Sequence, residues 1–460
     1  MAWNVVVAGG GFGGLYTARA LERLLPRHSA KLTIVSESNF LLYSPLLPAV
    51  ASGALNPRHV TIPIREELQD AQLLIGRVAA CDPERRTLRV VSVEGETMEL
   101  PYDQLIVALG SVSRNLPIPG LAENAIGFKS VLEALHLRDS VLRSLEMAET
   151  IDVPEVRAQH LTYVVAGGGY TGVEVIAELQ DLASEILHLY PRCAAQGMRW
   201  LLVEAGDRIM REVPEDLAEF TVRELRRRGI EVLTSTRLEG VGEGRVALST
   251  GEEVPARTVV WTAGIAPSPA VAELGLPLDE HGRIAVDDCL QVQGRDDVWA
   301  IGDCAAVPDA ATPGQPCPPT AQHAMRQGAH LARNVAAALG HGERRPFKFK
   351  TIGLVVDLGR RQAVARILGV KLRGFPAWFC ARGYHLMAVP GMTRRIRLGL
   401  DWATEFFFRR DSAEWVPPRL PRLSLAAFRD PEAVEISFRT PPAAGGEDGS
   451  GQNEEPARSG

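Results

Sequence analysis

Two glycine-rich loops of the same form constrain the fold of this chain more than any other feature. Each lies between an apolar run and a helix-like stretch, and each satisfies G-x-G-x-x-G; the glycines are Gly9, Gly11 and Gly14 in the first loop and Gly167, Gly169 and Gly172 in the second. Glycine is required because a Cβ atom would block the tight turn and the approach of a pyrophosphate to the backbone. The following helix offers free N–H groups and its positive dipole end to the phosphates. We therefore expect an α/β protein with two Rossmann-like domains, each binding a dinucleotide.

An acidic residue lies at the end of the apolar strand that follows each loop. The segment KLTIVSES contains Glu37, and RWLLVEAGD contains Glu204. A carboxylate there accepts hydrogen bonds from ribose hydroxyls and repels a 2′-phosphate, so Glu204 predicts a preference for NADH over NADPH. A solvated acid at a strand end is the alternative for Glu204. In the first strand the register is open by one residue, because Ser36 could occupy the ribose position instead of Glu37.

The composition is that of an ordinary globular protein of 460 residues, long enough for two or three domains. The net charge of −6 does not point to nucleic acid. The six cysteines include no C-x-x-C pair, so neither a disulfide framework nor a metal site is indicated, and a reducing compartment is expected. The sequence has no secretory signal and no apolar run of the roughly 18 residues that a spanning helix needs. These features predict a protein made in the cytoplasm.

Three further segments follow the loops in a characteristic order: YDQLIVALGS at 102–111, TVVWTAGIAPSP at 258–269 and DVWAIGDCAAV at 297–307. With the two loops they resemble flavoproteins that have two dinucleotide-binding domains, the disulfide-reductase-like superfamily. The resemblance implies FAD at the first loop and NADH at the second, with Gly110 beside FAD, Gly264 beside NAD, and the Asp303 carboxylate on the ribityl chain of the flavin. From the residues alone, the Gly-Asp pair could be a β-turn.

The segment NFLLYSPLLPAVASG at 39–53 stands where disulfide reductases carry a reactive cysteine pair. It resembles type II NADH:quinone dehydrogenases, and a second match is PPTAQHAMRQGAHLARNV at 318–335, against the family pattern A-Q-x-A-x-Q-Q-G. Arg326 replaces the first of the paired glutamines. The resemblance implies Pro45 and Ala321 beside FAD, a catalytic role for Gln322, and Gln322, Arg326 and Gln327 toward the quinone. An ordinary amphipathic helix with an N-terminal Thr320 cap is the alternative.

The composition changes beyond residue 345. Residues 346–439 contain 17 Lys and Arg against 8 Asp and Glu, with aromatic residues between the arginines. This pattern predicts a pair of basic, aromatic, amphipathic helices that lies in a bilayer interface without crossing it. A basic face that closes the flavin domain, or a homodimer interface, is the alternative; single-stranded nucleic acid is disfavoured because no nucleic-acid fold accompanies the segment. Residues 440–460 lack aliphatic and aromatic bulk and are predicted to be disordered.

Glu174, just after the second loop, has no counterpart in the first. Thr171-x-x-Glu174 fits a capping box, in which each side chain satisfies a free backbone N–H. The superfamily architecture implies another role, because this helix points its N-terminus at the nicotinamide where that ring stacks on the flavin. Glu174 could there bind the carboxamide and relay a proton to or from flavin N5, and burial would raise its pKa into a useful range.

The predicted layout is an FAD domain at 1–117 and 285–345, an inserted NAD(H) domain at 118–284, and a membrane-binding segment at 346–439. The family resemblance implies a non-proton-pumping NADH:quinone oxidoreductase, peripheral on the cytoplasmic face of the plasma membrane, that passes a hydride from NADH to FAD and then two electrons to a quinone. The rivals are a soluble NADH-dependent reductase for a ferredoxin or small oxidant, and a low-turnover redox sensor or scaffold. Sulfide:quinone oxidoreductase is disfavoured because Cys304 has no second cysteine placed to partner it.

Overall fold

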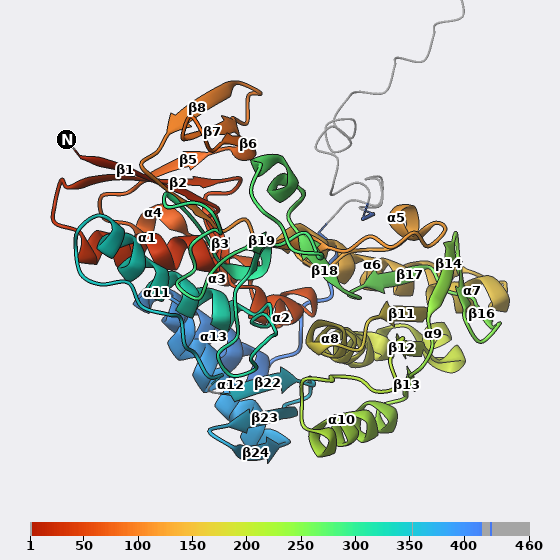
Figure 1. Cartoon of the computed structure of the whole chain (residues 1–460). Helices are drawn as coiled ribbons and strands as arrows, with labels where there is room; N and C mark the ends of the chain where they lie inside the picture. The colour runs from red at the N-terminus through yellow and green to blue at the C-terminus, as the bar shows by residue number, and fades with distance from the viewer. Residues whose placement is uncertain (1, 352, 416–423, 426–460) are drawn as a thin grey trace, which may run out of the picture.

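The computed structural model describes residues 2–351, 353–415, 424 and 425. Its first sheet is parallel and has five strands in the order β20-β9-β1-β2-β5. Three of them, β1, β2 and β5, are labelled side by side in Figure 1. These are β1 (Trp3–Ala8), β2 (Ala30–Ser36), β5 (Gln72–Ile75), β9 (Gln104–Val107) and β20 (Val298–Ala300). The chain leaves this sheet after β9 and returns to it at β20, which pairs in parallel with β9.

The second parallel sheet is built between these two passages. Its order is β13-β12-β11-β17, from β11 (Thr162–Ala166), β12 (Arg199–Val203), β13 (Ile230–Leu233) and β17 (Thr258–Trp261). Every residue of β11 and β17 is buried, as expected for parallel strands covered on both faces, which read as continuous apolar runs. The two predicted α/β units are therefore present, with the second placed between two passages of the first.

Helices and short sheets surround the two parallel sheets. The helices are α1 (Phe12–Leu24), α2 (Leu47–Ala51), α3 (Pro57–Val60), α4 (Ile64–Glu67), α5 (Leu121–Asn124), α6 (Val131–Thr150), α7 (Pro154–His160), α8 (Tyr170–Ile186), α9 (Pro191–Gln196), α10 (Glu215–Arg227) and α11 (Ala321–Ala338). Antiparallel sheets form from β6 (Arg77–Asp82), β7 (Thr87–Val91) and β8 (Thr97–Pro101), and from β14 (Leu238–Gly242), β15 (Arg245–Leu248) and β16 (Glu253–Val254). The remaining pairs are β3 (Phe40–Leu42) with β4 (Thr61–Pro63), β10 (Ser111–Ser113) with β18 (Ile265–Pro267), and β19 (Ile284–Ala285) with β21 (Ala305–Ala306).

The α1 and α11 helices lie very close together beside the first loop. A Cβ atom on Gly328 of α11 would come within 2.5 Å of the Gly13 carbonyl oxygen. Glycine at 328 therefore brings the backbone of α11 against the start of α1, the helix that follows the first loop.

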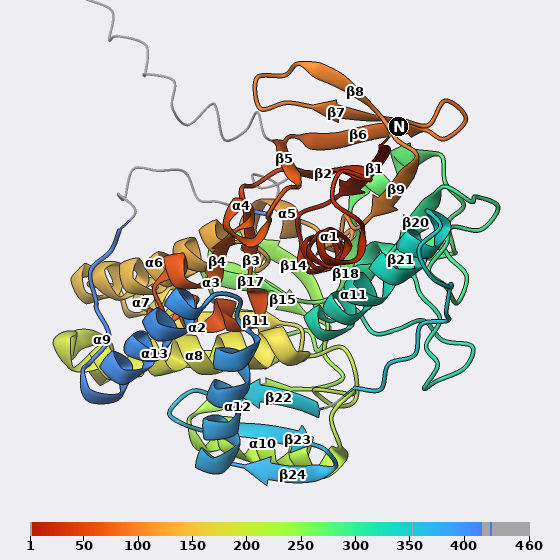
Figure 2. The ribbon, with the colours of Figure 1, turned by 90° about the vertical axis from the view of Figure 1, so that its left-hand side faces the viewer.

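The segment after residue 345 differs from the prediction in its first half. An antiparallel sheet of β22 (Gly353–Asp357), β23 (Ala363–Ile367) and β24 (Val370–Arg373) comes first, and the expected pair of helices follows as α12 (Phe375–Ala388) and α13 (Met392–Phe407). Figure 2 shows the sheet beside α10 and the two helices alongside α2 and α8. The prediction of helices alone was wrong for residues 353–373.

In the part of the chain that the structure describes, none of the helices combines the length and apolar character needed to cross a bilayer. The predicted disorder of 440–460 lies outside the described residues.

Candidate active site

The first loop has the backbone geometry that its glycines predicted. Gly9 has φ of 118°, and a Cβ atom there would collide with the Ala108 carbonyl oxygen; one on Gly14 would collide with the carbonyl oxygen of Gly9. Gly11, by contrast, faces open space within 4 Å. Because α1 starts directly after Gly11, a residue without a capping side chain, its first N–H groups are available to an anion. The loop thus forms a cradle that suits a pyrophosphate.

The second loop repeats this geometry. Gly167 has φ of 112°, a Cβ on Gly172 would collide with the Gly167 carbonyl oxygen, and Gly169 again faces open space. The α8 helix begins at Tyr170 with Gly169 as its N-cap. Thr171 is therefore the second helical residue and Glu174 the fifth, so the capping box considered for this pair is wrong. The N-terminal N–H groups of α8 stay available to a second dinucleotide.

The strand registers decide which residues follow the two glycine loops in space. Ala8 pairs with Val35, and Ala166 pairs with Val203, so Ser36 occupies the position equivalent to Glu204. The structure therefore favours Ser36, the alternative left open, over the exposed Glu37 at the ribose end of the first site.

Glu204 has a contact that the sequence did not predict. Its Oε2 accepts a hydrogen bond from the Gly168 N–H at 2.6 Å, and its Oε1 accepts one from the Gly206 N–H at 2.7 Å. The side chain thus fixes the second glycine loop. A carboxylate oxygen can accept more than one bond, so both oxygens can still accept from ribose hydroxyls.

Asp303 lies in the short helix η4 (Gly302–Cys304), between the two return segments. Its Oδ2 accepts a hydrogen bond from Ser111 Oγ at 2.7 Å, and Ser111 Oγ accepts one from Lys129 Nζ at 3.2 Å. Burial lowers the pKa of Lys129, and the nearby Asp303 carboxylate opposes that shift. Gly110 directly precedes β10 and Gly264 directly precedes β18; because these strands pair antiparallel, Gly110 lies at the end of the pair beside Ser111 and Gly264 lies at the opposite end. Asp303 is thereby held in one orientation, with its other oxygen left for a ligand hydroxyl.

The α11 helix brings the predicted quinone residues to the same region. It begins at Ala321, after Thr320, whose side chain accepts a hydrogen bond from the His323 N–H, so the Thr320 cap is confirmed. Gln327 is buried, and its Oε1 accepts a hydrogen bond from the Gly302 N–H at 2.8 Å, which supports the turn that carries Asp303. The Arg326 guanidinium lies 5.8 Å from the centre of the Phe349 ring.

Gln322 is the residue of α11 with an unsatisfied polar group. Its Nε2 donates to Tyr384 Oη at 3.3 Å, while its Oε1 is buried and has no hydrogen-bond partner among the described residues. A buried amide oxygen is expensive to leave unpaired, so such atoms usually face a ligand or water. This geometry fits the predicted role of Gln322 toward a substrate.

Glu174 is partly buried and packs against the C-terminal segment. Its Oε1 accepts a hydrogen bond from the Asp357 N–H of β22 at 3.1 Å. Burial raises the pKa of Glu174 well above its ordinary value, and burial likewise raises the pKa of Asp357. Both carboxyl groups line a cavity of about 20 Å³ together with Pro45, Glu178, Arg382 and His385. Its raised pKa favours the protonated form of Glu174 more than an exposed carboxyl group would.

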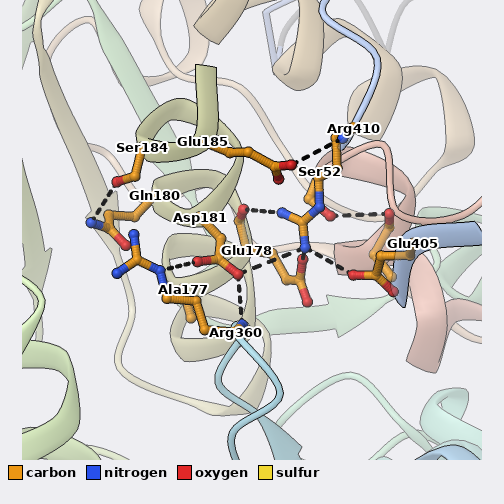
Figure 3. Close-up of polar contacts among 12 residues, drawn as sticks. Ser52, Ala177, Glu178, Gln180, Asp181, Ser184, Glu185, Arg360, Glu405 and Arg410 are labelled. Atoms are coloured by element: carbon orange, nitrogen blue, oxygen red, sulfur yellow. Dashed lines mark hydrogen bonds and ion pairs between the residues drawn. The ribbon is translucent and has the colours of Figure 1, made fainter. Parts of the chain in front are cut away.

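A network of charged side chains, most of them buried, connects α8 to Arg410, which follows α13 (Figure 3). Arg410 Nη2 lies 3.2 Å from Glu178 Oε2, 3.0 Å from Glu405 Oε1 and 3.7 Å from Asp181 Oδ2. Asp181 also pairs with Arg360 and Arg228. The helix that carries Glu174 is thus fastened to both halves of the segment, to the β22–β23 turn and to the residues after α13.

The sequence analysis missed two residues: Asp357, the partner of Glu174, and His385, the partner of Tyr43. Tyr43 Oη lies 3.2 Å from His385 Nδ1, across 342 residues of sequence. Tyr43 lies in a segment that was singled out, but nothing in the local sequence around Asp357 or His385 distinguishes them. Only the packing of the C-terminal segment brings them to the site.

Comparison with known proteins places this geometry in context. The family described as "Pyridine nucleotide-disulphide oxidoreductase" matches residues 3–328. The chain is 30% identical to the demethylphylloquinone reductase NdbB of Synechocystis, over 87% of this chain and 96% of the relative. It is also 30% identical to the type II NADH:quinone oxidoreductase Ndh of Mycobacterium tuberculosis, over 88% of this chain and 89% of the relative. The solved structure of NDH2 from Plasmodium falciparum in complex with NADH superposes with a TM-score of 0.83 at 20% identity, over 90% of this chain and 100% of that one, a likeness of fold.

Proposed function

Because this chain belongs to the pyridine nucleotide-disulphide oxidoreductase family, and within it to the type II NADH:quinone oxidoreductases, we propose that it transfers two electrons from NADH through FAD to a quinone. The observation that carries the proposal is the pair of open glycine cradles together with Asp303 and the unsatisfied amide of Gln322. When bound, FAD supplies the two-electron chemistry, and the protein supplies binding, orientation and proton supply.

The chain's own residues would bind FAD, bind NADH and supply a proton beside the nicotinamide. The backbone around Gly9, Gly11 and Gly14 holds the FAD pyrophosphate, and Asp303 holds the ribityl chain. The backbone around Gly167, Gly169 and Gly172 holds the NADH pyrophosphate, with Glu204 on its ribose; Gly110 and Gly264 lie at the entrances of the two return strands. Pro45 and Ala321 would lie beside the flavin ring, as the family resemblance implies. In the arrangement that the superfamily resemblance implies, the nicotinamide would lie near the N-terminus of α8, and the Glu174 carboxyl group would hold a proton beside it.

The acceptor end of the site is formed by α11. The Nε2 of Gln322 can donate a hydrogen bond to a quinone carbonyl, and its Oε1 can accept one from the hydroxyl of the quinol product. Arg326 adds a positive charge, which favours the negative charge that develops on a quinone oxygen during reduction. Gln327 supports this end indirectly, through its bond to Gly302.

We further propose that α12 and α13 lie in the interface of the plasma membrane, on its cytoplasmic face. Large apolar side chains are exposed on both helices and just after them: Phe375, Phe379, Met387, Met392, Ile396, Leu400, Phe406, Phe407 and Phe408. Arginines stand between them, as in helices that lie on anionic bilayers. Membrane binding at this face would let a lipid-soluble quinone reach α11 without entering water. A homodimer that buries the same face is the competing arrangement.

Steady-state turnover of the purified protein with NADH and a short-chain quinone tests the reaction. Oxidation of NADH that depends on quinone supports the proposal; turnover only with a ferredoxin or a small oxidant favours the soluble rival, and negligible turnover favours the sensor.

Flotation with vesicles of phosphatidylglycerol and phosphatidylcholine tests the membrane arrangement. Phe379→Ser with Met387→Ser should release the protein from vesicles, whereas Val93→Ser, an exposed apolar residue between β7 and β8, should not. If the unmodified protein stays off the vesicles and elutes as a dimer, the apolar face belongs to a dimer interface.

A further inference from the structure

A buried tyrosine and a partly buried histidine, far apart in the sequence, contact each other beside the first glycine loop. Tyr43 is 1% exposed, and its Oη lies 3.2 Å from His385 Nδ1. The Tyr43 ring packs edge-on against Phe12, the residue directly after Gly11, with 5.8 Å between ring centres. The phenol is therefore held next to the loop that binds FAD, and its hydroxyl has a partner that can both accept and donate a proton.

His385 reaches from Tyr43 to the cavity that contains Glu174. The cavity of about 20 Å³ is lined by His385 together with Glu174, Glu178, Asp357 and Arg382. A cavity needs roughly 10–15 Å³ and two to four polar partners to hold a water molecule. This one meets both conditions, so one water can connect the His385 imidazole to the Glu174 carboxyl group.

The charged and titratable groups that face His385 are Tyr43, Tyr384 and Arg382, the carboxyl groups of Glu174 and Glu178 on α8, and Asp357 on β22. Burial and the nearby Arg382 lower the pKa of His385 to about 3, so its imidazole is neutral. Burial raises the pKa of the Glu174 carboxyl well above its ordinary value, which favours its protonated form. A neutral imidazole between a phenol and a carboxylic acid can pass a proton from one to the other.

The same turn of α12 contacts the predicted quinone residue. Tyr384, the neighbour of His385, accepts a hydrogen bond from Gln322 Nε2 at 3.3 Å, and the Tyr384 and His385 rings lie 5.2 Å apart. The Tyr43–His385 pair thus lies between the carboxyl cluster on one side and the acceptor end on the other.

We infer that Tyr43 and His385 form a proton relay to the quinone, an inference that rests on the proposed function. NADH supplies two electrons and one hydrogen, so reduction of a quinone to a quinol requires one further proton. In the relay, the Tyr43 O–H bond breaks as a quinone O–H bond forms, and the His385 Nδ1 proton moves to the Tyr43 oxygen. The Glu174 carboxyl proton reaches His385 Nε2 through the cavity water, and solvent reprotonates the carboxylate. Rotation of the Tyr43 hydroxyl and exchange of the imidazole proton between its nitrogens restore the starting state.

The relay gives the C-terminal segment a second role. His385 and Tyr384 lie on α12, whose other residues include the exposed Phe379 and Met387. The helix proposed to contact the membrane therefore also contributes side chains to the acceptor end of the site.

The test compares an acceptor that takes up protons with one that takes only electrons. Tyr43→Phe and His385→Gln are assayed with a short-chain quinone and with ferricyanide, and Tyr102→Phe, which removes a buried hydroxyl bonded to Cys81, is the matched control. Quinone turnover should fall roughly ten-fold or more in both relay variants, since positioned proton donors contribute at least about a hundred-fold. In both relay variants, ferricyanide turnover and the melting temperature should match those of the unmodified protein. In Tyr102→Phe, turnover with quinone, turnover with ferricyanide and the melting temperature should all be unchanged.

The pH dependence provides a readout that a structural defect would not change. Quinone turnover of the unmodified protein should fall as pH rises through the raised pKa of Glu174, because the relay needs its proton. This alkaline limb should disappear in both relay variants. Equal losses with quinone and ferricyanide, or no loss with either, overturn the relay alone. An unmodified protein that reduces ferricyanide but no quinone overturns the proposed function and the relay with it.

Discussion

Replacing Arg410 with methionine removes a cation that lies within ion-pair distance of three acidic side chains, Glu178, Asp181 and Glu405 (Figure 3). The Arg410 side chain is 6% exposed, and that of Glu178 is 1% exposed. In the Arg410→Met variant, Asp181 keeps Arg228 and Arg360, and Glu405 keeps Arg382. Glu178, by contrast, is buried and loses its ion pair with Arg410.

The cost depends on whether Glu178 is ionised. Removing one partner of a buried ion pair costs about 3–5 kcal/mol while the other stays charged. Burial raises the pKa of Glu178 from 4.5 to about 7 even with Arg410 present. A carboxyl group whose pKa is raised by folding contributes stability that is present below pH 4.5 and is lost as pH rises through 7. Without Arg410 the folded-state pKa rises further, so this loss continues to higher pH. The difference between variant and unmodified protein should be largest above pH 7 and small near pH 5.

Hydrogen exchange of peptides from α13 measures the effect, because Arg410 fastens the end of this helix to α8. A loss of about 3 kcal/mol in local stability corresponds to roughly a hundred-fold loss of protection. This loss is expected at pH 8, with a much smaller one at pH 5.5 after correction for intrinsic exchange. Arg409→Met is the matched control, since Arg409 is exposed and bonds only to His188 among the described residues.

Two outcomes would refute this reasoning. Equal protection of α13 in the Arg410→Met variant and the unmodified protein at pH 8 would show that the buried pair contributes nothing. A Glu178→Met, Arg410→Met double variant should recover much of the protection, because removing both charges leaves no unpaired ion. A double variant less protected than Arg410→Met would show that Glu178 is not the source of the cost.

The dinucleotide sites give three more predictions. Glu204→Gln keeps an acceptor for the glycine loop but removes the charge that disfavours a 2′-phosphate, so an NADH preference of roughly ten-fold or more in kcat/KM should narrow, and an unchanged ratio would contradict the assignment. Glu174→Gln still accepts a hydrogen bond from the Asp357 N–H but carries no transferable proton, so quinone turnover should fall roughly ten-fold and the alkaline limb of its pH profile should disappear. Thr171→Ala, at a residue that caps nothing, should change the free energy of unfolding by no more than about 0.5 kcal/mol. Rates of Glu174→Gln equal to those of the unmodified protein across pH would exclude a proton role for Glu174. Asp303→Ala should lose noncovalently bound FAD on dialysis, measured as flavin absorbance per protein, and full retention would remove Asp303 from the site.

The local sequence determined those features that depend on neighbouring residues. Gly9 and Gly167 stand where the backbone has a positive φ and closely approaches a neighbouring segment. Only glycine suits such a position, so the G-x-G-x-x-G pattern can be recognised from the sequence alone. The apolar runs of β1 and β11, the helices behind them and the Thr320 cap of α11 follow from the same short-range rules. The α/β fold and the two dinucleotide sites could therefore be predicted without the structure.

Pairing between distant segments decided the rest. Only the register of β1 with β2 shows that Ser36, and not Glu37, is equivalent to Glu204. Only the start of α8 at Tyr170 excludes the capping box, since a matching pattern of residues does not set where a helix begins. The partners Asp357 of Glu174 and His385 of Tyr43 lie 183 and 342 residues away. Such contacts depend on how β22 and α12 pack against the two α/β units, and that packing depends on the shape of the assembled core, which no local pattern of residues encodes.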